Sequence, residues 1–141
     1  MDPKLLPKLT RLLSLRDHSR AELRAKLARD FDKIEIERAL DIVESRRWLA
    51  PDPEISDRAA ESLARKFKSA AEIEATMIRR GLPPPSGASS REEESEKIRA
   101  LVKKKFGSGK LDDGKKRKAM GFLARHGFEE DMIEKVLHAE F

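Results

Sequence analysis

Apolar side chains recur along this chain at helical spacing, three or four residues apart. Residues 19–29 (SRAELRAKLAR) and 69–80 (SAAEIEATMIRR) share one pattern, in which a glutamate stands three residues after a serine and apolar residues follow at four-residue spacing. Ser-x-x-Glu is a capping box that begins a helix: each of the two side chains accepts a hydrogen bond from the backbone N–H of the other residue. The pattern therefore predicts two equivalent helices, whose short apolar stripes need neighbouring helices to cover them.

The first fifty residues are predicted to form a unit of three helices. A leucine-rich stripe precedes the capping box of residues 19–29, and a third apolar stripe follows it. Asp30 is predicted to end the second helix, because aspartate tolerates the left-handed conformation better than most residues. Asp32 and Glu35 are predicted to cap the third helix. Residues 3–48 thus contain three helices.

The C-terminal segment repeats this plan. The stretch 107–109, with two glycines, is predicted to separate a helix that ends at Phe106 from a second helix. Gly127 is predicted to end that second helix as its C′ residue, and Phe128 to pack back before a third helix begins. The same spacing joins two sets of residues, which are Phe31, Ile36, Glu37 and Leu40 in the first unit and Phe128, Ile133, Glu134 and Leu137 in the last.

The middle unit is predicted to be incomplete. Two helices are expected at 54–68 and 70–80, but three consecutive prolines in GLPPPSGASS (81–90) exclude a third regular helix there. The predicted fold is all-α, with tandem three-helix repeats in an elongated, curved array whose middle repeat lacks most of its third helix. We place the first repeat at 1–50, the truncated second repeat at 51–82, a Pro/Gly/Ser linker at 83–91 and the third repeat at 92–141.

The composition narrows the class of protein. Charged residues make up 40% of the chain and hydrophobic residues 38%, which favours a thin stack of helices over a thick spherical core. There is no cysteine, and the three histidines lack ligand spacing, so we expect no metal and no cofactor. No apolar run approaches the roughly 20 residues that span a membrane, and the first ten residues lack the apolar core of a signal peptide. We therefore expect a cytoplasmic monomer.

The net charge of +5 permits contact with nucleic acid or with an acidic protein surface. The alternative is a solvated surface, because Asp17 and Glu22 can neutralise nearby arginines and lysines suit the C-terminus of a helix. Candidate partner-binding residues are the regularly spaced arginines near the first capping box and the basic residues of the last unit. They are Arg16, Arg20, Arg24, Lys103, Lys104, Lys116, Arg117 and Arg125.

Other conspicuous residues give no sign of catalysis. Trp48, the only tryptophan, could stack on a nucleobase, but we favour a role in sealing the joint between two repeats. His126 is predicted to help satisfy the carbonyl groups at a helix end. The chain shows no nucleophile elbow and no carboxylates paired in a pocket context, and GSGK (107–110) lacks the spacing and preceding strand of a P-loop. We predict no enzymatic activity.

Two segments resemble the RecX family of bacterial recombination regulators. LRDHSRAELRAKLARDFDKIEIERALDIVE (15–44) resembles the family's first repeat, and KLDDGKKRKAMGFLARHGFEEDMIEKVL (110–137) resembles its last. The segment WLAPDPEISDRAA (48–60) departs from the family pattern. It keeps only Asp57, Arg58 and Ala60 of an aspartate-rich turn that is followed by an aromatic residue and an alanine.

The resemblance implies a partner and an activity. RecX-like proteins bind RecA, lie along the helical groove of the RecA filament on single-stranded DNA, and inhibit its ATPase and strand exchange. They thereby modulate recombination, DNA repair and the SOS response, either by blocking filament growth or by promoting disassembly. The resemblance predicts the RecA nucleoprotein filament as partner, with weak contact to single-stranded or duplex DNA. The alternative is a stand-alone DNA-binding protein whose three-helix units act like helix-turn-helix domains.

Overall fold

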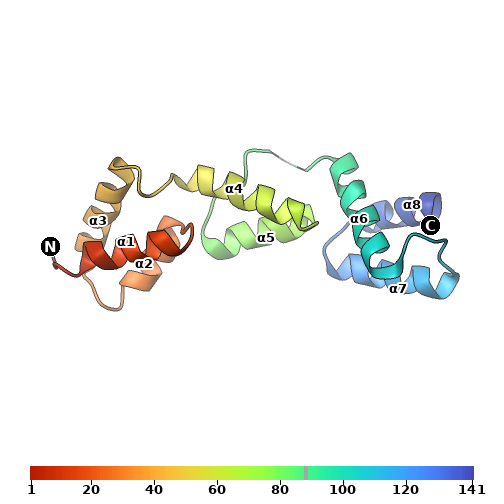
Figure 1. The fold of residues 1–141 in the computed structure, drawn as a ribbon, viewed down its shortest axis with the longest axis horizontal. Coiled ribbons are helices and arrows are strands. Elements are labelled where there is room, and N and C mark those ends of the chain that lie inside the picture. Colours follow the sequence, from red (N-terminus) through yellow and green to blue (C-terminus); the bar gives the residue numbers. More distant parts are fainter. Residues whose placement is uncertain (88) are drawn as a thin grey trace. The chain divides into compact units, whose positions relative to one another are not determined.

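The computed structural model describes residues 1–87 and 89–141, which contain eight helices and no strand. The all-α prediction is confirmed (Figure 1). Residue 88 belongs to the predicted linker and lies outside the described residues. The helices are α1 (Leu5–Leu15), α2 (Arg20–Leu27), α3 (Lys33–Ser45), α4 (Asp52–Arg65), α5 (Ala70–Arg80), α6 (Arg91–Phe106), α7 (Asp113–Arg125) and α8 (Glu130–Glu140).

The helices form two compact units, and each unit combines one terminal three-helix module with part of the middle helices. The first unit contains Met1–Ala59 and Thr76–Ser86. The second contains Ala60–Ala75 and Gly87–Phe141. The division therefore passes through α4 and α5, which supply residues to both units. Helices as short as these depend on such shared packing, because a single amphipathic helix cannot bury its own stripe.

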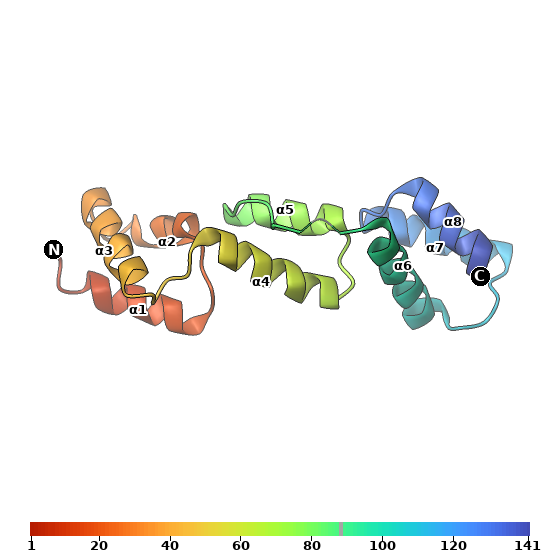
Figure 2. The same cartoon turned by 90° about the horizontal axis from the view of Figure 1, so that it is seen from above.

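In the first unit, α1, α2 and α3 enclose a small apolar core (Figure 2). The capping box that begins α2 is complete, because Ser19 Oγ accepts a hydrogen bond from Glu22 N–H and Glu22 Oε1 accepts one from Ser19 N–H. The stripes predicted from the sequence supply the core of this module. Its buried residues include Leu5, Leu9, Leu23, Leu27, Ile36, Ala39, Leu40 and Val43.

Two expectations about the turn between α2 and α3 are wrong in detail. Helix α2 ends at Leu27 rather than at Asp30, and Asp30 does not adopt a left-handed conformation; instead, its carboxylate pairs with Lys8 Nζ at 2.8 Å. Asp32 does cap α3, since it accepts from Ile34 N–H, but Glu35 accepts from Asp2 N–H instead of completing the box. The tertiary partner of each carboxylate is a group on the N-terminal segment, which local spacing does not reveal.

In the second unit, α6, α7 and α8 pack together (Figure 1). Gly127 ends the turn after α7 with φ +87°, as predicted, and the hydrogen bonds from Gly127 N–H to Ala124 O and from Phe128 N–H to Leu123 O form a Schellman motif. Phe128 packs back into the core, also as predicted. The core residues are Ile98, Val102, Leu111, Ala119, Leu123, Phe128, Met132, Ile133, Val136, Leu137 and Phe141.

A joint between helix ends connects α2 to α5 in the first unit. Ser19 Oγ, besides capping α2, donates a hydrogen bond to the carbonyl oxygen of Arg80 at 2.6 Å. The Arg80 guanidinium in turn pairs with Glu22, with Nε 3.1 Å from Oε1. Gly81 follows with φ +67°, and a Cβ at this position would lie only 2.7 Å from Ala21 Cβ. The capping box of α2 thus also binds the C-terminus of α5.

The second unit repeats this joint between α5 and α7. Ser69 Oγ donates to the carbonyl oxygen of His126 at 2.6 Å, and Glu72 Oε1 lies 3.0 Å from His126 Nδ1. A Cβ on Gly127 would lie 2.9 Å from Ser69 Oγ. The backbone N–H of His126 donates to carbonyl oxygens in the last turn of α7, as predicted. Its imidazole contacts the Glu72 carboxylate, which the sequence did not indicate. In both joints, Ser-x-x-Glu receives a basic residue that stands directly before a left-handed glycine.

Acid is expected to weaken the α2–α5 joint. Burial alone would raise the pKa of Glu22, but the hydrogen bonds from Ser19 N–H and Arg16 and the charge of Arg80 outweigh it and lower the pKa from 4.5 to about 2. A carboxyl whose pKa is lower when folded stabilises the fold above its unfolded pKa, so this contribution is full above about pH 4.5 and is lost as the pH falls toward 2. Urea titrations at pH 7 and pH 3 should show a loss of about 1–2 kcal/mol that depends on this group. The variant Glu22→Gln is the control, and an equal loss in that variant would contradict the assignment.

The middle repeat lacks a third helix, as predicted. No helix lies between Arg80 and Arg91 in the described residues. Part of this segment is nevertheless attached to α4: Ser56 Oγ donates to Pro83 O at 2.7 Å, and Asp57 accepts from Ser86 N–H at 2.8 Å, which lowers the pKa of Asp57. The boundaries given above for the repeats and the linker remain predictions.

Candidate functional site

The three candidate arginines of the first unit are engaged in ion pairs within the fold. Arg20 pairs with three acidic residues of α3, among them Asp41 at 2.9 Å. Arg24 pairs with Glu37 of the same helix, and this contact raises the pKa of Arg24. Arg16 pairs with Glu22 at 2.9 Å. These side chains hold α2 against α3 and complete the α2–α5 joint. Because carboxylates already neutralise their charges, they are less able to attract an anionic partner.

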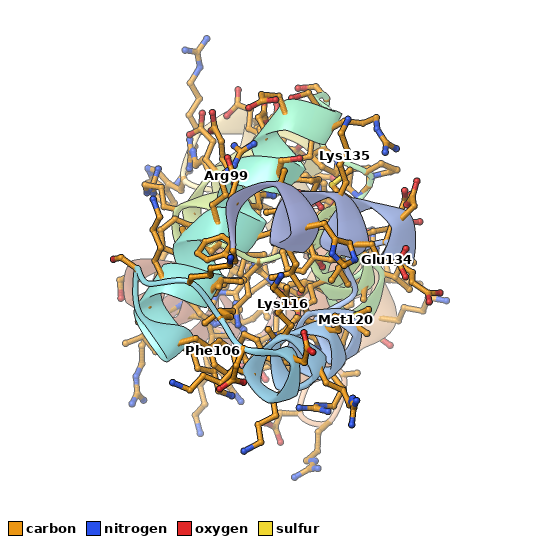
Figure 3. All side chains as sticks on the ribbon, turned by 90° about the vertical axis from the view of Figure 1, so that its right-hand side faces the viewer. Arg99, Phe106, Lys116, Met120, Glu134 and Lys135 are labelled. Atoms are coloured by element: carbon orange, nitrogen blue, oxygen red, sulfur yellow. The ribbon has the colours of Figure 1, made fainter. Side chains whose placement is uncertain are left out.

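The candidate residues of the second unit are different, because they have no such acidic partners. Lys103 and Lys104 lie exposed in the last turn of α6, where the helix dipole favours cations. Arg117 and Arg125 lie exposed on α7. Lys116 is half-buried on the side of α7 that carries the buried stripe, and Figure 3 shows it on a different helix from Phe106. Within residues 1–87 and 89–141, none of these five side chains has a carboxylate at salt-bridge distance.

A groove on the second unit brings some of these cations together. It lies between the C-terminal end of α6 and one face of α7, and its volume is about 310 Å³, at the small end of the range for ligand sites. We call it the basic groove. Its lining residues are Lys105, Phe106, Arg117, Lys118, Gly121, Phe122 and Arg125, which include four cations and no acidic residue.

Aromatic rings form part of the basic groove. Phe106 and Phe122 are both partly exposed and meet edge to face, with their ring centroids 6.4 Å apart. Lys105 Nζ lies 3.9 Å from the centroid of the Phe122 ring, in a cation–π contact. The groove therefore combines an aromatic floor with cations at its rim.

Sequence reasoning identified two of the four cations of the basic groove. Lys105 and Lys118 were missed, as was the part played by Phe122. A signal for the groove exists in the sequence, because residues spaced by four positions share one face of a helix. Arg117, Gly121 and Arg125 have this spacing on α7. Nothing local, however, indicates that the end of α6 lies beside this face.

A second hollow, in the first unit, has both basic and acidic residues in its lining, unlike the basic groove. Asp2, Lys4, Lys8, Asp30 and Phe31 are among the residues that line it. Its basic side chains share the surface with carboxylates, and the ion pair between Lys8 and Asp30 already neutralises one of them. The basic groove of the second unit is therefore the stronger candidate for binding an anionic partner.

Trp48 does not seal a joint between repeats, so that expectation is wrong. Its side chain is 50% exposed, while its neighbour Leu49 is buried. The guanidinium carbon of Arg46 lies 5.0 Å from the centroid of the indole ring. Arg47, between the two, adopts φ +60°, and this left-handed residue turns the chain so that the next apolar side chain to be buried is that of Leu49.

The described residues offer no metal site, since no group of three or more His, Asp or Glu side chains among them is arranged to hold an ion. None of the helices in the described residues is long and apolar enough to cross a membrane.

Comparison with known proteins identifies the family to which these three-helix modules belong. Residues 92–137, which include the basic groove, match the model of the third three-helix domain of RecX, and residues 9–41 match the model of its first three-helix domain. The chain is 31% identical over 130 residues to the regulatory protein RecX of Leptothrix cholodnii, covering 89% of this chain and 82% of that protein. The chain belongs to the RecX family.

Other relatives agree with this assignment. The regulatory protein RecX of Chromobacterium violaceum is 33% identical over 129 residues, which cover 89% of this chain and 84% of the relative. The crystal structure of RecX from Lactobacillus salivarius has a TM-score of 0.77 and 16% identity, and covers 96% of this chain and 94% of that one. At that identity the structural likeness supports the fold, and the sequence relatives support the regulatory role of this RecX-family chain.

Proposed function

We propose that this chain is a non-enzymatic regulator that binds the RecA filament on single-stranded DNA and inhibits its ATPase and strand exchange. The observation that carries the proposal is membership of the RecX family, with relatives that are named regulatory proteins and that match along most of their length. Matches to the first and third three-helix domains of RecX, at the two ends of the chain, support it further.

In this proposal the chain meets its partner mainly through the second unit. The unpaired cations there can contact acidic groups of the filament, whereas Arg20 and Arg24 are largely neutralised by α3. Cations that already have a partner gain little from a second one, because the desolvation that a new contact requires is not offset by as much new attraction. The partner-binding set is accordingly Lys103, Lys104, Lys116, Arg117 and Arg125, together with Lys105 and Lys118.

RecA's DNA-dependent ATP turnover tests the proposal. We expect substoichiometric amounts of the chain to lower the turnover of RecA on single-stranded DNA. A variant with glutamine at the four cations of the basic groove should lose most of this inhibition. Each of these cations is expected to be attracted to the same anionic surface of the filament. The four positions are Lys105, Arg117, Lys118 and Arg125.

A matched control is available elsewhere on the chain. The control changes two arginines and two lysines to glutamine, which removes the same net charge. All four are exposed and lack an ion pair in the described residues. This control should inhibit RecA's ATP turnover as strongly as the parent chain does. The control positions are Arg29, Lys33, Arg38 and Lys66. If ATP turnover is unaffected even by an excess of the parent chain, the proposed function is refuted.

The alternative of a stand-alone DNA-binding protein makes a different prediction. Such a protein should bind duplex or single strands tightly without RecA, with a steep dependence on salt concentration. A filament regulator should bind bare DNA weakly by comparison. Both measurements use the same purified chain.

A further inference from the structure

We propose that the buried ion pair of Glu94 and Lys97 docks the start of α5 on the module of α6, α7 and α8, and that the start of α5 detaches reversibly from this module without unfolding it. The inference goes beyond the proposed function, because it concerns a motion within the second unit and requires no partner. It is argued from the burial of the two charges, from their contacts and from the apolar core of the module.

Glu94 and Lys97 are charged residues that α6 buries together with its apolar stripe. Other charged residues nearby on the same helix, such as Glu93 and Glu96, are exposed. A buried ion pair adds little stability compared with a well-packed apolar pair, because both charges lose their hydration. Its presence on α6 therefore needs another reason, and the best-attested one is that such a pair selects a single arrangement of the elements that contact it.

The two side chains contact different segments of the second unit. Glu94 Oε1 accepts a hydrogen bond from the backbone N–H of Ala70, the first residue of α5, at 2.8 Å. A carboxylate suits this position, because a helix N-terminus carries partial positive charge and N–H groups without a partner in the helix. Lys97 Nζ pairs with Glu94 Oε2 and also donates to Ser89 Oγ at 3.1 Å, just before α6 begins. The pair thus connects α6 to the start of α5.

The joint between α5 and α7 adds further polar contacts at the start of α5. Ser69 Oγ donates to His126 O, and Glu72 Oε1 contacts the imidazole of His126. The apolar cluster of the module, by contrast, consists of residues between Ile98 and Phe141 and includes none from α5. The start of α5 is therefore held by hydrogen bonds and ion pairs rather than by a share in that core.

An attachment of this kind can open locally. When it opens, water replaces the hydrogen bonds that are lost, and both buried charges regain their hydration. The module keeps its apolar core, since no residue of α5 belongs to it. Regions held by few apolar contacts open at a lower free energy than the core of the same protein. Detachment of the start of α5 should therefore cost less than unfolding of the module.

Native-state hydrogen exchange of the full chain tests this opening, because two isoleucines offer a matched pair of amides. Ile73 is the fourth residue of α5 and Ile133 the fourth of α8, and each N–H bonds at 3.0 Å to the carbonyl oxygen of the residue before its helix. Both side chains are buried. We expect the Ile73 amide to be roughly tenfold or more less protected, with a weaker dependence on urea because less surface is exposed. Equal protection and equal urea dependence would show that α5 and the module open together, and would overturn the inference.

The double variant Glu94→Leu, Lys97→Met tests the part played by the pair. Its thermal midpoint should stay within about 5 °C of the parent's, because neither charge is left buried alone. The Ile73 amide should nevertheless exchange roughly tenfold or more faster, since α5 loses the carboxylate at its N-terminus. Exchange of the Ile133 amide should stay as in the parent. Unchanged exchange at Ile73, or an equal acceleration at both amides, would refute the role of the pair.

The variant Glu96→Leu, Lys103→Met is the matched control. It makes the same two substitutions on α6, but at exposed positions. Exchange of the Ile73 and Ile133 amides should be the same in this control as in the parent. Faster exchange at Ile73 in the control would assign the effect to loss of charge from α6 rather than to the buried pair, which would contradict the inference. None of these measurements includes RecA, so their failure would leave the proposed function standing.

Discussion

Replacing Lys97 with alanine is expected to lower the free energy of unfolding by about 3–5 kcal/mol. Lys97 is only 5% exposed and Glu94 only 9%, and Lys97 Nζ lies 2.7 Å from Glu94 Oε2 on α6. Glu94 also accepts a hydrogen bond from Ala70 N–H at the start of α5, with a distance of 2.8 Å. Without the ammonium group, a buried carboxylate would remain that has no opposite charge, and Oε2 of Glu94 has no aligned hydrogen bond to compensate.

Urea unfolding followed by circular dichroism measures this effect. Lys104→Ala on the same helix is the control, and it should change the stability by less than about 0.5 kcal/mol because its side chain is exposed. The double variant Glu94→Leu, Lys97→Met should recover much of the loss, since replacement of both charges leaves neither one buried alone. A loss below about 1 kcal/mol in Lys97→Ala would mean that water reaches the carboxylate.

Gly127→Ala is expected to destabilise the second unit by about 2–3 kcal/mol. A left-handed alanine costs about 1–2 kcal/mol, and the new Cβ would press against Ser69 Oγ and disturb its hydrogen bond to His126, at a cost of about 1 kcal/mol. The predicted loss therefore comes from both the backbone and the joint between α5 and α7.

Two other glycines separate these contributions. Gly107 has φ +86°, but no atom lies within 4 Å of the place that a Cβ would occupy, so Gly107→Ala reports the backbone cost alone. Gly109 has neither a positive φ nor a close neighbour, so Gly109→Ala should be nearly neutral. The expected order of destabilisation in thermal unfolding is Gly127, then Gly107, then Gly109. If Gly127→Ala costs no more than Gly107→Ala, the contact with Ser69 does not constrain the joint.

The duplicated Ser-x-x-Glu pattern separates what local sequence predicts from what it does not. It predicted the start of α2 and the start of α5 to the residue, because a capping box involves only atoms within four positions along the chain. It did not reveal that the serine hydroxyl donates to a carbonyl some sixty residues away, nor that the glutamate pairs with Arg80 in one unit and with His126 in the other. Those partners depend on which helix ends meet within each unit.

The candidate arginines also differ between what the sequence predicts and what the fold shows. Their regular spacing is visible in the sequence and suggested a basic edge. The fold places α3 beside α2, so that Asp41 and Glu37 neutralise Arg20 and Arg24. Lys105 and Phe122 are not among the predicted partner-binding residues, and they form part of a candidate site only because the end of α6 lies beside α7.

The sequence by itself determined the helices, most of their caps, the missing third helix of the middle repeat and the resemblance to the RecX family. These features depend on hydrogen bonds and side-chain spacing within one or two helical turns. Only the tertiary structure decided which cations are paired, which way Trp48 faces, and where the basic groove lies. Those properties depend on how one helix packs against the next, where a small shift in packing changes the partner of a long charged side chain.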